Sequence, residues 1–342
     1  MRALLAIVLL AAAAWSGWWW FNASTRESAV EAWLAERRVA GWVAEAADVS
    51  TSGFPNRVDL TVTELALADP REGWLWEAPF FQVLSLTWKP QHFIAVWPTE
   101  QVFATPYERA RIENSRMRGS LVFVPGLDLS LDRSTVEVEN LLITGDAGWS
   151  AELARVVLST RRAEAERASG LHDYDLNLDA AGLVLPEEWA AGLDRAGVLP
   201  TRMEAAGLDA TLAFDRPWDR HAIEGQSPAL EGIVVRDMRV SWGRLDLRGR
   251  GELAADTRGY AEGQLDLRVR NWQEMLEIAV QADLIGRSTA RALETGLGLM
   301  ARLGGTRGAI DVPLVFEDGQ MLLAAPIGSI AIGAAPRLTS RR

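Results

Sequence analysis

The chain has 342 residues, of which 49% are hydrophobic, and its formal net charge is -11 at pH 7. This acidic balance argues against a nucleic-acid partner, because phosphates need a basic surface. The absence of cysteine excludes disulfides and thiolate chemistry and is compatible with export from the cytoplasm.

Residues 1–22 are predicted to form an N-terminal transmembrane anchor. No charged residue lies between Ala3 and Phe21, and a helix of that length is roughly 28 Å long, close to the ~30 Å hydrocarbon core of a bilayer. The run ends in an aromatic cluster that comprises Trp15, Trp18, Trp19, Trp20 and Phe21. Tryptophan favours the headgroup layer because its ring is apolar and its N–H needs a partner, so we expect an interfacial belt here.

The charges at the N-terminus predict the orientation of this anchor. Arg2 and the α-amino group precede the apolar run, which favours a cytoplasmic N-terminus and a periplasmic location for the bulk of a single-pass inner-membrane protein. The alternative is a cleaved signal peptide, with Ala3 to Leu10 as its apolar region and Ala12 to Ala14 as its cleavage site. Both interpretations place the rest of the chain outside the cytoplasm.

Residues 23–47 are predicted to form a separate, amphipathic juxtamembrane helix. Ser24 and Glu27 have the spacing of a capping box, which starts a helix by satisfying two backbone N–H groups. Apolar residues then recur at helical spacing from Val30 to Ala46. We expect this helix to pack against the domain that follows; the alternative is that it lies on the lipid surface.

A short motif of Gly53, Phe54, Pro55, Asn56 and Arg57 is predicted to form a helix-to-strand hinge. Glycine permits an unusual backbone angle, proline holds the preceding residue extended, and asparagine suits a turn. The Arg57 guanidinium suits an acid or a lipid phosphate as partner. A structural role in fixing the first strand is the interpretation we favour.

Residues 48–342 are predicted to form an exported, antiparallel β-rich domain. From Arg244 to Leu253, charged residues alternate with leucine and glycine without a break. The run from Leu265 to Val269 repeats this alternation after a turn-rich connection, so the two runs predict a hairpin. Asp318 and Gly319 separate two further strand-like runs, which is the strongest short-range hairpin signal.

Helical insertions are predicted near residues 186–197 and 272–303. Pro186 and two acids open the first, and the second has a broad apolar face that Gly286 and Ser288 divide. Such helices must cover an apolar face of the sheet. The predicted fold class is therefore α+β and strand-dominated: a long curved antiparallel β-sheet, as a half-barrel or meander, with packed helices and an N-terminal transmembrane helix.

The stretches "SGFPNRVDLTVTELALADP" and "WEAPFFQVLSLTWKPQHFIAVWP" resemble the N-terminal signature of an uncharacterised alphaproteobacterial family, catalogued as domain of unknown function twenty-one twenty-five. The likeness extends more weakly to the closing "DVPLVFEDGQMLLAAP". The resemblance implies no catalytic residue. In its anchor, glycine-punctuated strands and terminal hairpin the chain is also similar to AsmA-like envelope proteins, which implies a curved sheet that carries or organises lipids between membranes.

No catalytic, cofactor-binding or metal site is predicted. His172, Asp173 and Asp175 fit the polar face of a strand, and the chain lacks a P-loop, a dinucleotide fingerprint and zinc-ligand spacing. We therefore expect a non-enzymatic, membrane-anchored periplasmic envelope protein that binds or transfers a phospholipid or other acyl lipid in an apolar sheet groove. The alternative is a scaffold or assembly factor for envelope protein partners. A long apolar groove favours lipid, and a packed interior favours the scaffold.

Overall fold

The computed structural model describes residues 1–164, 172–193, 197, 199–225, 227–281, 286–303, 309–325 and 328–339. The chain divides into two compact units, of which the first comprises Met1–Pro125 and Ser134–Trp149 and the second Gly126–Arg133 and Ser150–Arg342. For the β-rich region over residues 48–342, the length of the chain predicted either two domains or one elongated sheet. A chain of this length exceeds what one compact core usually holds, which accounts for the division.

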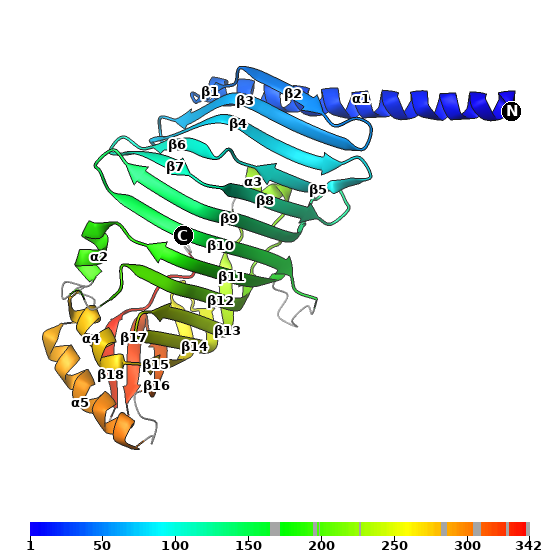
Figure 1. The fold of residues 1–342 in the computed structure, drawn as a ribbon. Helices are drawn as coiled ribbons and strands as arrows, with labels where there is room; N and C mark the ends of the chain where they lie inside the picture. The colour runs from blue at the N-terminus through cyan, green and yellow to red at the C-terminus, as the bar shows by residue number, and fades with distance from the viewer. Residues whose placement is uncertain are drawn as a thin grey trace. The chain divides into compact units, whose positions relative to one another are not determined.

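The first unit contains one helix and a series of antiparallel strands (Figure 1). Its elements are α1 (Arg2–Val39), β1 (Val43–Glu45), β2 (Asp48–Ser52), β3 (Arg57–Asp69), β4 (Trp74–Leu86), β5 (Lys89–Val96), β6 (Glu100–Ala104), β7 (Arg109–Glu113), β8 (Arg116–Phe123) and most of β9 (Leu131–Gly145). Strand β3 shows the expected alternation, with Val58, Leu60 and Val62 buried. The alternation changes phase at Glu64, whose φ is +50°, so that Leu65 and not Glu64 enters the core.

Helix α1 is one continuous helix, and the prediction of a separate helix over residues 23–47 is wrong. Ser24 does not act as a cap: its hydroxyl donates to the Phe21 carbonyl at 3.1 Å, a bond typical of a helix interior. The helix ends at Val39, and Gly41 follows with φ +91°. The chain then enters strand β1, where Ala44 pairs with Leu67 of β3.

A small hydrophobic core joins the C-terminal half of α1 to the sheet of the first unit. Leu34 of α1 is buried with Ala44, Val62, Leu65 and Leu67. The same helix also carries the apolar N-terminal segment, whose residues from Ala3 to Trp15 are exposed. Packing against the domain, which we expected for the helix over residues 23–47, is observed for Leu34.

The second unit is an antiparallel meander with four helices among its described residues. Its elements are β10 (Ser150–Arg162), β11 (His172–Val184), α2 (Glu187–Leu193), β12 (Arg202–Phe214), α3 (Arg220–Glu224), β13 (Leu230–Trp242), β14 (Leu245–Ala255), β15 (Ala261–Arg270), α4 (Trp272–Gln281), α5 (Arg287–Leu303), β16 (Ala309–Glu317), β17 (Gln320–Ala325) and β18 (Gly328–Ala334). Each strand from β10 to β18 pairs antiparallel with the next. The strand-dominated antiparallel fold class is thus confirmed.

Both predicted hairpins form. Strand β14 pairs with β15, with Leu247 opposite Val269. Strands β16 and β17 pair from Glu317 opposite Gln320, around a turn in which Asp318 and Gly319 have φ of +52° and +75°. Two consecutive positive φ values are what a tight type I′ hairpin turn requires, and aspartate followed by glycine tolerates them best.

Helices α4 and α5 cover the apolar face of the C-terminal strands. Their buried residues pack with strand residues in one cluster that comprises Val269, Trp272, Leu276, Leu293, Leu297, Ile310 and Val312. The helices lie within the expected range 272–303, and α5 begins directly after Gly286; residues 282–285 lie outside the described residues. Helix α2 lies within the expected range 186–197, of which residues 194–196 are likewise outside.

Candidate membrane-proximal site

One face of α1 attaches the helix to the sheet of the first unit. The residues on this face follow one another at intervals of three or four: Trp15, Trp19, Ala23, Arg26, Val30 and Leu34. Ala23 and Leu34 are buried, and Trp15, Trp19 and Arg26 donate hydrogen bonds to the sheet or its turns. Such spacing places side chains on one side of a helix, so a single uninterrupted stripe explains why α1 does not break at Ser24.

Two tryptophans of this stripe bind the motif Gly53–Arg57. The Trp15 indole N–H donates to the Pro55 carbonyl at 3.0 Å, and the Trp19 indole N–H donates to the Arg57 carbonyl at 2.6 Å. The Trp19 ring also meets the Phe54 ring edge to face, with centroids 5.5 Å apart. Sequence reasoning treated the aromatic cluster and the motif as separate features, and the structure brings part of each together.

The motif is a turn between two strands, and the prediction of a helix-to-strand hinge is wrong. It connects β2 to β3, which pair antiparallel with Ser52 opposite Asp59. Gly53 has φ +100°, and a Cβ there would lie 2.8 Å from the Arg57 Cβ, so glycine is required. The peptide between Phe54 and Pro55 is cis. The short polar run of β2 escaped prediction because its five residues carry little hydrophobic pattern.

Arg57 takes an acid as its partner. Its guanidinium lies 2.7 Å from the Asp59 carboxylate, with Asp59 two residues along the same strand. Residues at i and i+2 share one face of a strand, so this pair needs no tertiary contact to form. This geometry agrees with the structural role that we favoured for Arg57.

Several large aromatic side chains at the same end of the first unit remain exposed. On α1 the exposed fractions are 43% for Trp18, 68% for Trp20 and 64% for Phe21. Phe54 is 54% exposed, and Trp88, in the turn between β4 and β5, is 55% exposed. The two turns are joined, because the Thr87 backbone N–H donates to the Asn56 carbonyl at 3.1 Å. Sequence reasoning missed Trp88, although a tryptophan between two strand-like runs was a usable signal.

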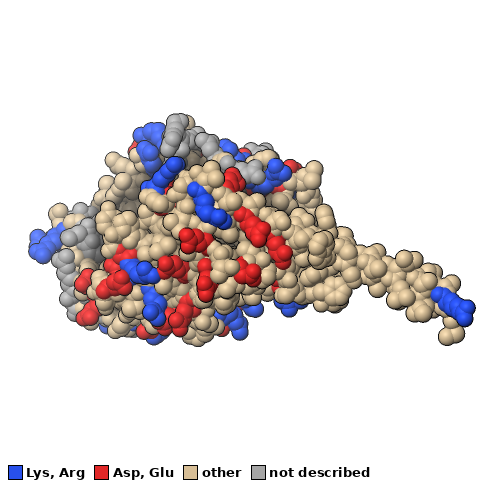
Figure 2. Space-filling model, turned by 90° about the horizontal axis from the view of Figure 1, so that it is seen from above, with Lys and Arg blue, Asp and Glu red and all other residues tan. Residues whose placement is uncertain are grey.

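The part of α1 that extends beyond this attachment is short and uncharged except at its N-terminal end (Figure 2). Helix α1 as a whole, Arg2–Val39, is the one helix in the described part of the chain that is long and apolar enough to cross a membrane. Its unattached part, from Arg2 to Trp15, measures about 20 Å, whereas a hydrocarbon core is ~30 Å thick. If it spans, the turns that carry Phe54 and Trp88 must enter the outer leaflet or the bilayer must thin there.

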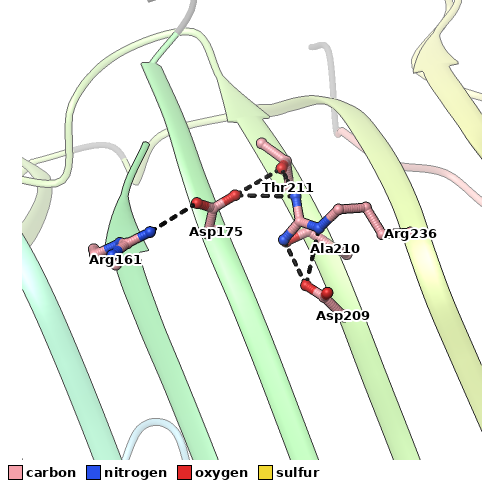
Figure 3. A network of polar contacts seen from close by, with 6 residues as sticks. All are labelled: Arg161, Asp175, Asp209, Ala210, Thr211 and Arg236. Carbon is pink, nitrogen blue, oxygen red and sulfur yellow. Dashed lines mark hydrogen bonds and ion pairs between the residues drawn. The ribbon is translucent and has the colours of Figure 1, made fainter. Parts of the chain in front are cut away.

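A polar network lies on the second unit, across four neighbouring strands (Figure 3). Arg236 occupies a bulge in β13, where the register shifts, and its guanidinium bonds Asp209 at 2.5 Å and Asp175 at 3.1 Å. Thr211 donates to Asp175 at 2.8 Å, and Arg161 lies 3.7 Å from the same carboxylate. Burial raises the pKa of Asp175, but the hydrogen bonds from Thr211 and Arg236 outweigh it and hold the pKa below its ordinary value.

This network offers no catalytic arrangement. Its charges compensate one another, and the described residues contain no group of three or more acidic or histidine side chains suited to a metal. Asp175 lies part-exposed on the polar strand face, as expected, and is held there by Arg236 and Thr211. Asp173, which was expected on the same solvated face, is buried. The arrangement joins β10, β11, β12 and β13 and acts as a structural element.

The opposite face of the same strands presents a row of apolar side chains. In the strand register Leu158 of β10 pairs with Leu178, Leu178 with Leu208, and Leu208 with Met238 of β13. Directly paired residues share one face of a sheet. Leu158 is 38% exposed, and the other three are half-buried.

Cavities in the described parts of each unit have mixed linings. A cavity of about 400 Å³ in the first unit is lined by apolar residues together with Glu64, Glu77, Glu100 and Arg111. A cavity of about 650 Å³ in the second unit is lined by four arginines and three aspartates as well as by Leu267 and Val312. Neither is the dry apolar groove that would favour lipid by itself.

Comparisons with known proteins identify the family. A family model described as "Uncharacterized protein conserved in bacteria (DUF2125)" matches residues 19–336. None of the curated proteins and none of the solved structures matches the chain. The likeness to AsmA-like proteins stays a prediction. Because the match extends over nearly the whole length, the chain belongs to the bacterial family DUF2125.

Proposed function

We propose that this chain is a single-pass inner-membrane protein with a cytoplasmic N-terminus, and that its periplasmic bulk binds or transfers acyl lipid in envelope biogenesis. The observation that carries the proposal is the paired apolar row Leu158, Leu178, Leu208 and Met238 on one face of the second unit, in which Leu158 is 38% exposed and the other three are half-buried. An acyl chain that packs on this row would remove apolar surface from water, which is favourable by about 25 cal/mol of free energy for each Å² buried.

The helix α1 supports the membrane part of the proposal. Its uncharged segment, the exposed Trp18, Trp20 and Phe21, and the exposed Phe54 and Trp88 are suited to the headgroup layer. A signal peptide cleaved at Ala14 is the alternative, and the attached part of α1 begins at the next residue. The mass of the mature protein decides between the two, because an uncleaved anchor keeps residues 1–14.

Orientation is tested by cysteine labelling, for which the cysteine-free chain provides a clean background. Tyr107 is 95% exposed in the turn between β6 and β7. A Tyr107→Cys variant should react with a membrane-impermeant maleimide in cells whose outer membrane alone is permeabilised. Labelling that requires lysis of the inner membrane would contradict a periplasmic location.

Lipid binding is tested by photo-cross-linking from the apolar row. A photo-reactive benzoylphenylalanine replaces Leu158 in one variant and Val157 in the control, because neighbouring strand residues point to opposite faces. With cells grown on labelled fatty acid, we expect lipid adducts from position 158 and few from position 157. Equal labelling at both positions, or none at either in folded protein, would refute an acyl-lipid site on this face. Native mass spectrometry with lipid extraction would then identify the bound species.

A scaffold for envelope protein partners is the second candidate function. Helices α4 and α5 fill the apolar face of the C-terminal strands, with Leu276, Leu293 and Leu297 buried against Ile310 and Val312. A face that is filled by its own helices leaves no room for lipid there. Protein adducts in place of lipid adducts from position 158 would favour this function.

A further inference from the structure

Arg26 occupies an unusual place for a charged side chain. It lies on the attached stripe of α1, half-buried between the helix and the sheet of the first unit. One guanidinium nitrogen, Nη1, donates to the Ser85 hydroxyl at 2.5 Å, and the guanidinium carbon lies 5.7 Å from the centre of the Phe93 ring. None of the ion pairs found among the described residues includes Arg26.

Most N–H donors of the Arg26 guanidinium make no hydrogen bond to the described residues. Arginine has five N–H groups in a planar fork, and the one hydrogen bond found for Arg26 in the described part of the chain uses one of them. Arg26 is only half-buried, and none of its nitrogens is among the buried, unpartnered side-chain atoms of the described residues, so its other donors are accessible to a ligand. The partner that matches the fork best is a carboxylate or a phosphate, bound through two parallel hydrogen bonds.

The surroundings of Arg26 favour a phosphate with an apolar attachment. Ser85 is buried, pairs with Val58 on one side and with Phe93 on the other, and Phe93 pairs with Leu121. These four residues therefore form a row on one face of the sheet, from the buried Val58 near α1 to Leu121, which is 39% exposed. A ligand held at Arg26 would have an apolar surface beside it.

The height of Arg26 along α1 agrees with such a ligand. Arg26 lies about 36 Å from Arg2 along the helix axis, which is ~6 Å beyond a 30 Å hydrocarbon core whose inner edge is at Arg2. The headgroup layer on each side is roughly 5–7 Å thick. The guanidinium would thus stand at the level of the lipid phosphates.

We propose that Arg26, positioned by Ser85, binds a phosphate group, supplied by a phospholipid whose acyl chain continues over Phe93 and Leu121. The assignment of the phosphate to a phospholipid rests on the proposed function. The recognition of a phosphate by Arg26 does not. Arg26 supplies a bidentate pair of donors, and Phe93 the first apolar contact. The Ser85 hydroxyl accepts from Arg26 and donates to the Val58 carbonyl at 3.3 Å, so it orients the guanidinium and does not itself contact the phosphate. The site would therefore select lipids whose headgroup contains a phosphate.

The test uses the full chain, purified in a phosphate-free nonionic detergent, with four probes. These are dihexanoyl-phosphatidylglycerol, dihexanoyl-phosphatidylcholine, dihexanoylglycerol, which lacks phosphate, and inorganic phosphate. Binding is measured by titration calorimetry for wild type, for Arg26→Gln, and for Arg38→Gln, an exposed arginine on the same helix. We expect Arg26→Gln to weaken both phospholipids about tenfold or more and to leave dihexanoylglycerol unchanged, with Arg38→Gln equal to wild type.

The outcomes separate this inference from the proposed function. If Arg26→Gln binds phospholipid as wild type does, the Arg26 site is refuted while lipid binding stands. If wild type binds inorganic phosphate in an Arg26-dependent way but no lipid, the phosphate site stands and the lipid function is refuted. If Arg26→Gln does not fold, Ser85→Ala and Arg26→Lys decide the question. The first removes the group that orients the guanidinium, and the second removes the planar fork. Phospholipid binding equal to wild type in both variants would overturn the inference.

Discussion

The attachment of α1 to the turn Gly53–Arg57 yields a quantitative prediction. Replacing Trp15 and Trp19 by phenylalanine keeps two apolar rings but removes the two indole hydrogen bonds to the Pro55 and Arg57 carbonyls. At a net contribution of about 1 kcal/mol for each bond, the attachment should weaken by about 2 kcal/mol, or roughly 30-fold in its opening equilibrium. The edge-to-face contact with Phe54 is largely retained in this variant.

Hydrogen exchange of the full chain in detergent measures this opening. The informative amide is that of Arg57, which donates to the Gly53 carbonyl at 2.8 Å within the turn. It should exchange roughly 30-fold faster in the Trp15→Phe/Trp19→Phe variant. The matched control is Trp18→Phe/Trp20→Phe, which alters exposed residues. An unchanged Arg57 amide, or an equal acceleration in the control, would refute the reasoning.

Two further predictions concern the second unit. Arg236→Met should lower the free energy of unfolding at pH 7 by about 1 kcal/mol, since its ion pairs are partly exposed. Because the hydrogen bonds hold the pKa of Asp175 below its ordinary value, this contribution is present above pH ~4 and is lost as the pH falls through the lowered pKa. In urea unfolding at pH 7 and pH 3, the free energies of unfolding of the variant and wild type should converge at the lower pH. An equal difference at both pH values would contradict this prediction. Gly251→Ala should destabilise by about 2–4 kcal/mol, because its Cβ would lie 2.1 Å from the Gln264 carbonyl oxygen. Gly296→Ala, in the interior of α5 with nothing within 4 Å of the new Cβ, should instead stabilise by about 1 kcal/mol; thermal unfolding that gave both substitutions the same sign would refute this contrast.

Local sequence patterns predicted the strands and hairpins well. The turn at Asp318 and Gly319 follows from backbone preferences of two adjacent residues, and the alternation in β14 and β15 follows from one wet and one buried face. Such features need no knowledge of distant contacts. They were therefore within reach of the sequence alone.

Features that depend on tertiary contacts were not predictable in this way. The spacing of Ser24 and Glu27 suggested a helix start, but packing of one stripe against the sheet keeps α1 continuous through both residues. Likewise the partners of Arg236 depend on the register of strands up to 61 positions away in the chain. No local pattern specifies a bulge at Arg236 or the neighbours it acquires.

The unbroken course of α1 has a mechanical consequence. A domain tethered by a flexible linker explores a wide volume around its anchor. A stiff helix that contacts the first unit from Trp15 to Leu34 instead transmits any tilt of its N-terminal segment to that unit. The helix thereby fixes the distance and the angle between its N-terminal segment and the first unit. If the N-terminal segment is the membrane anchor that we propose, a ligand or partner of this unit would have to come to the bilayer surface, because the unit could not move away from it.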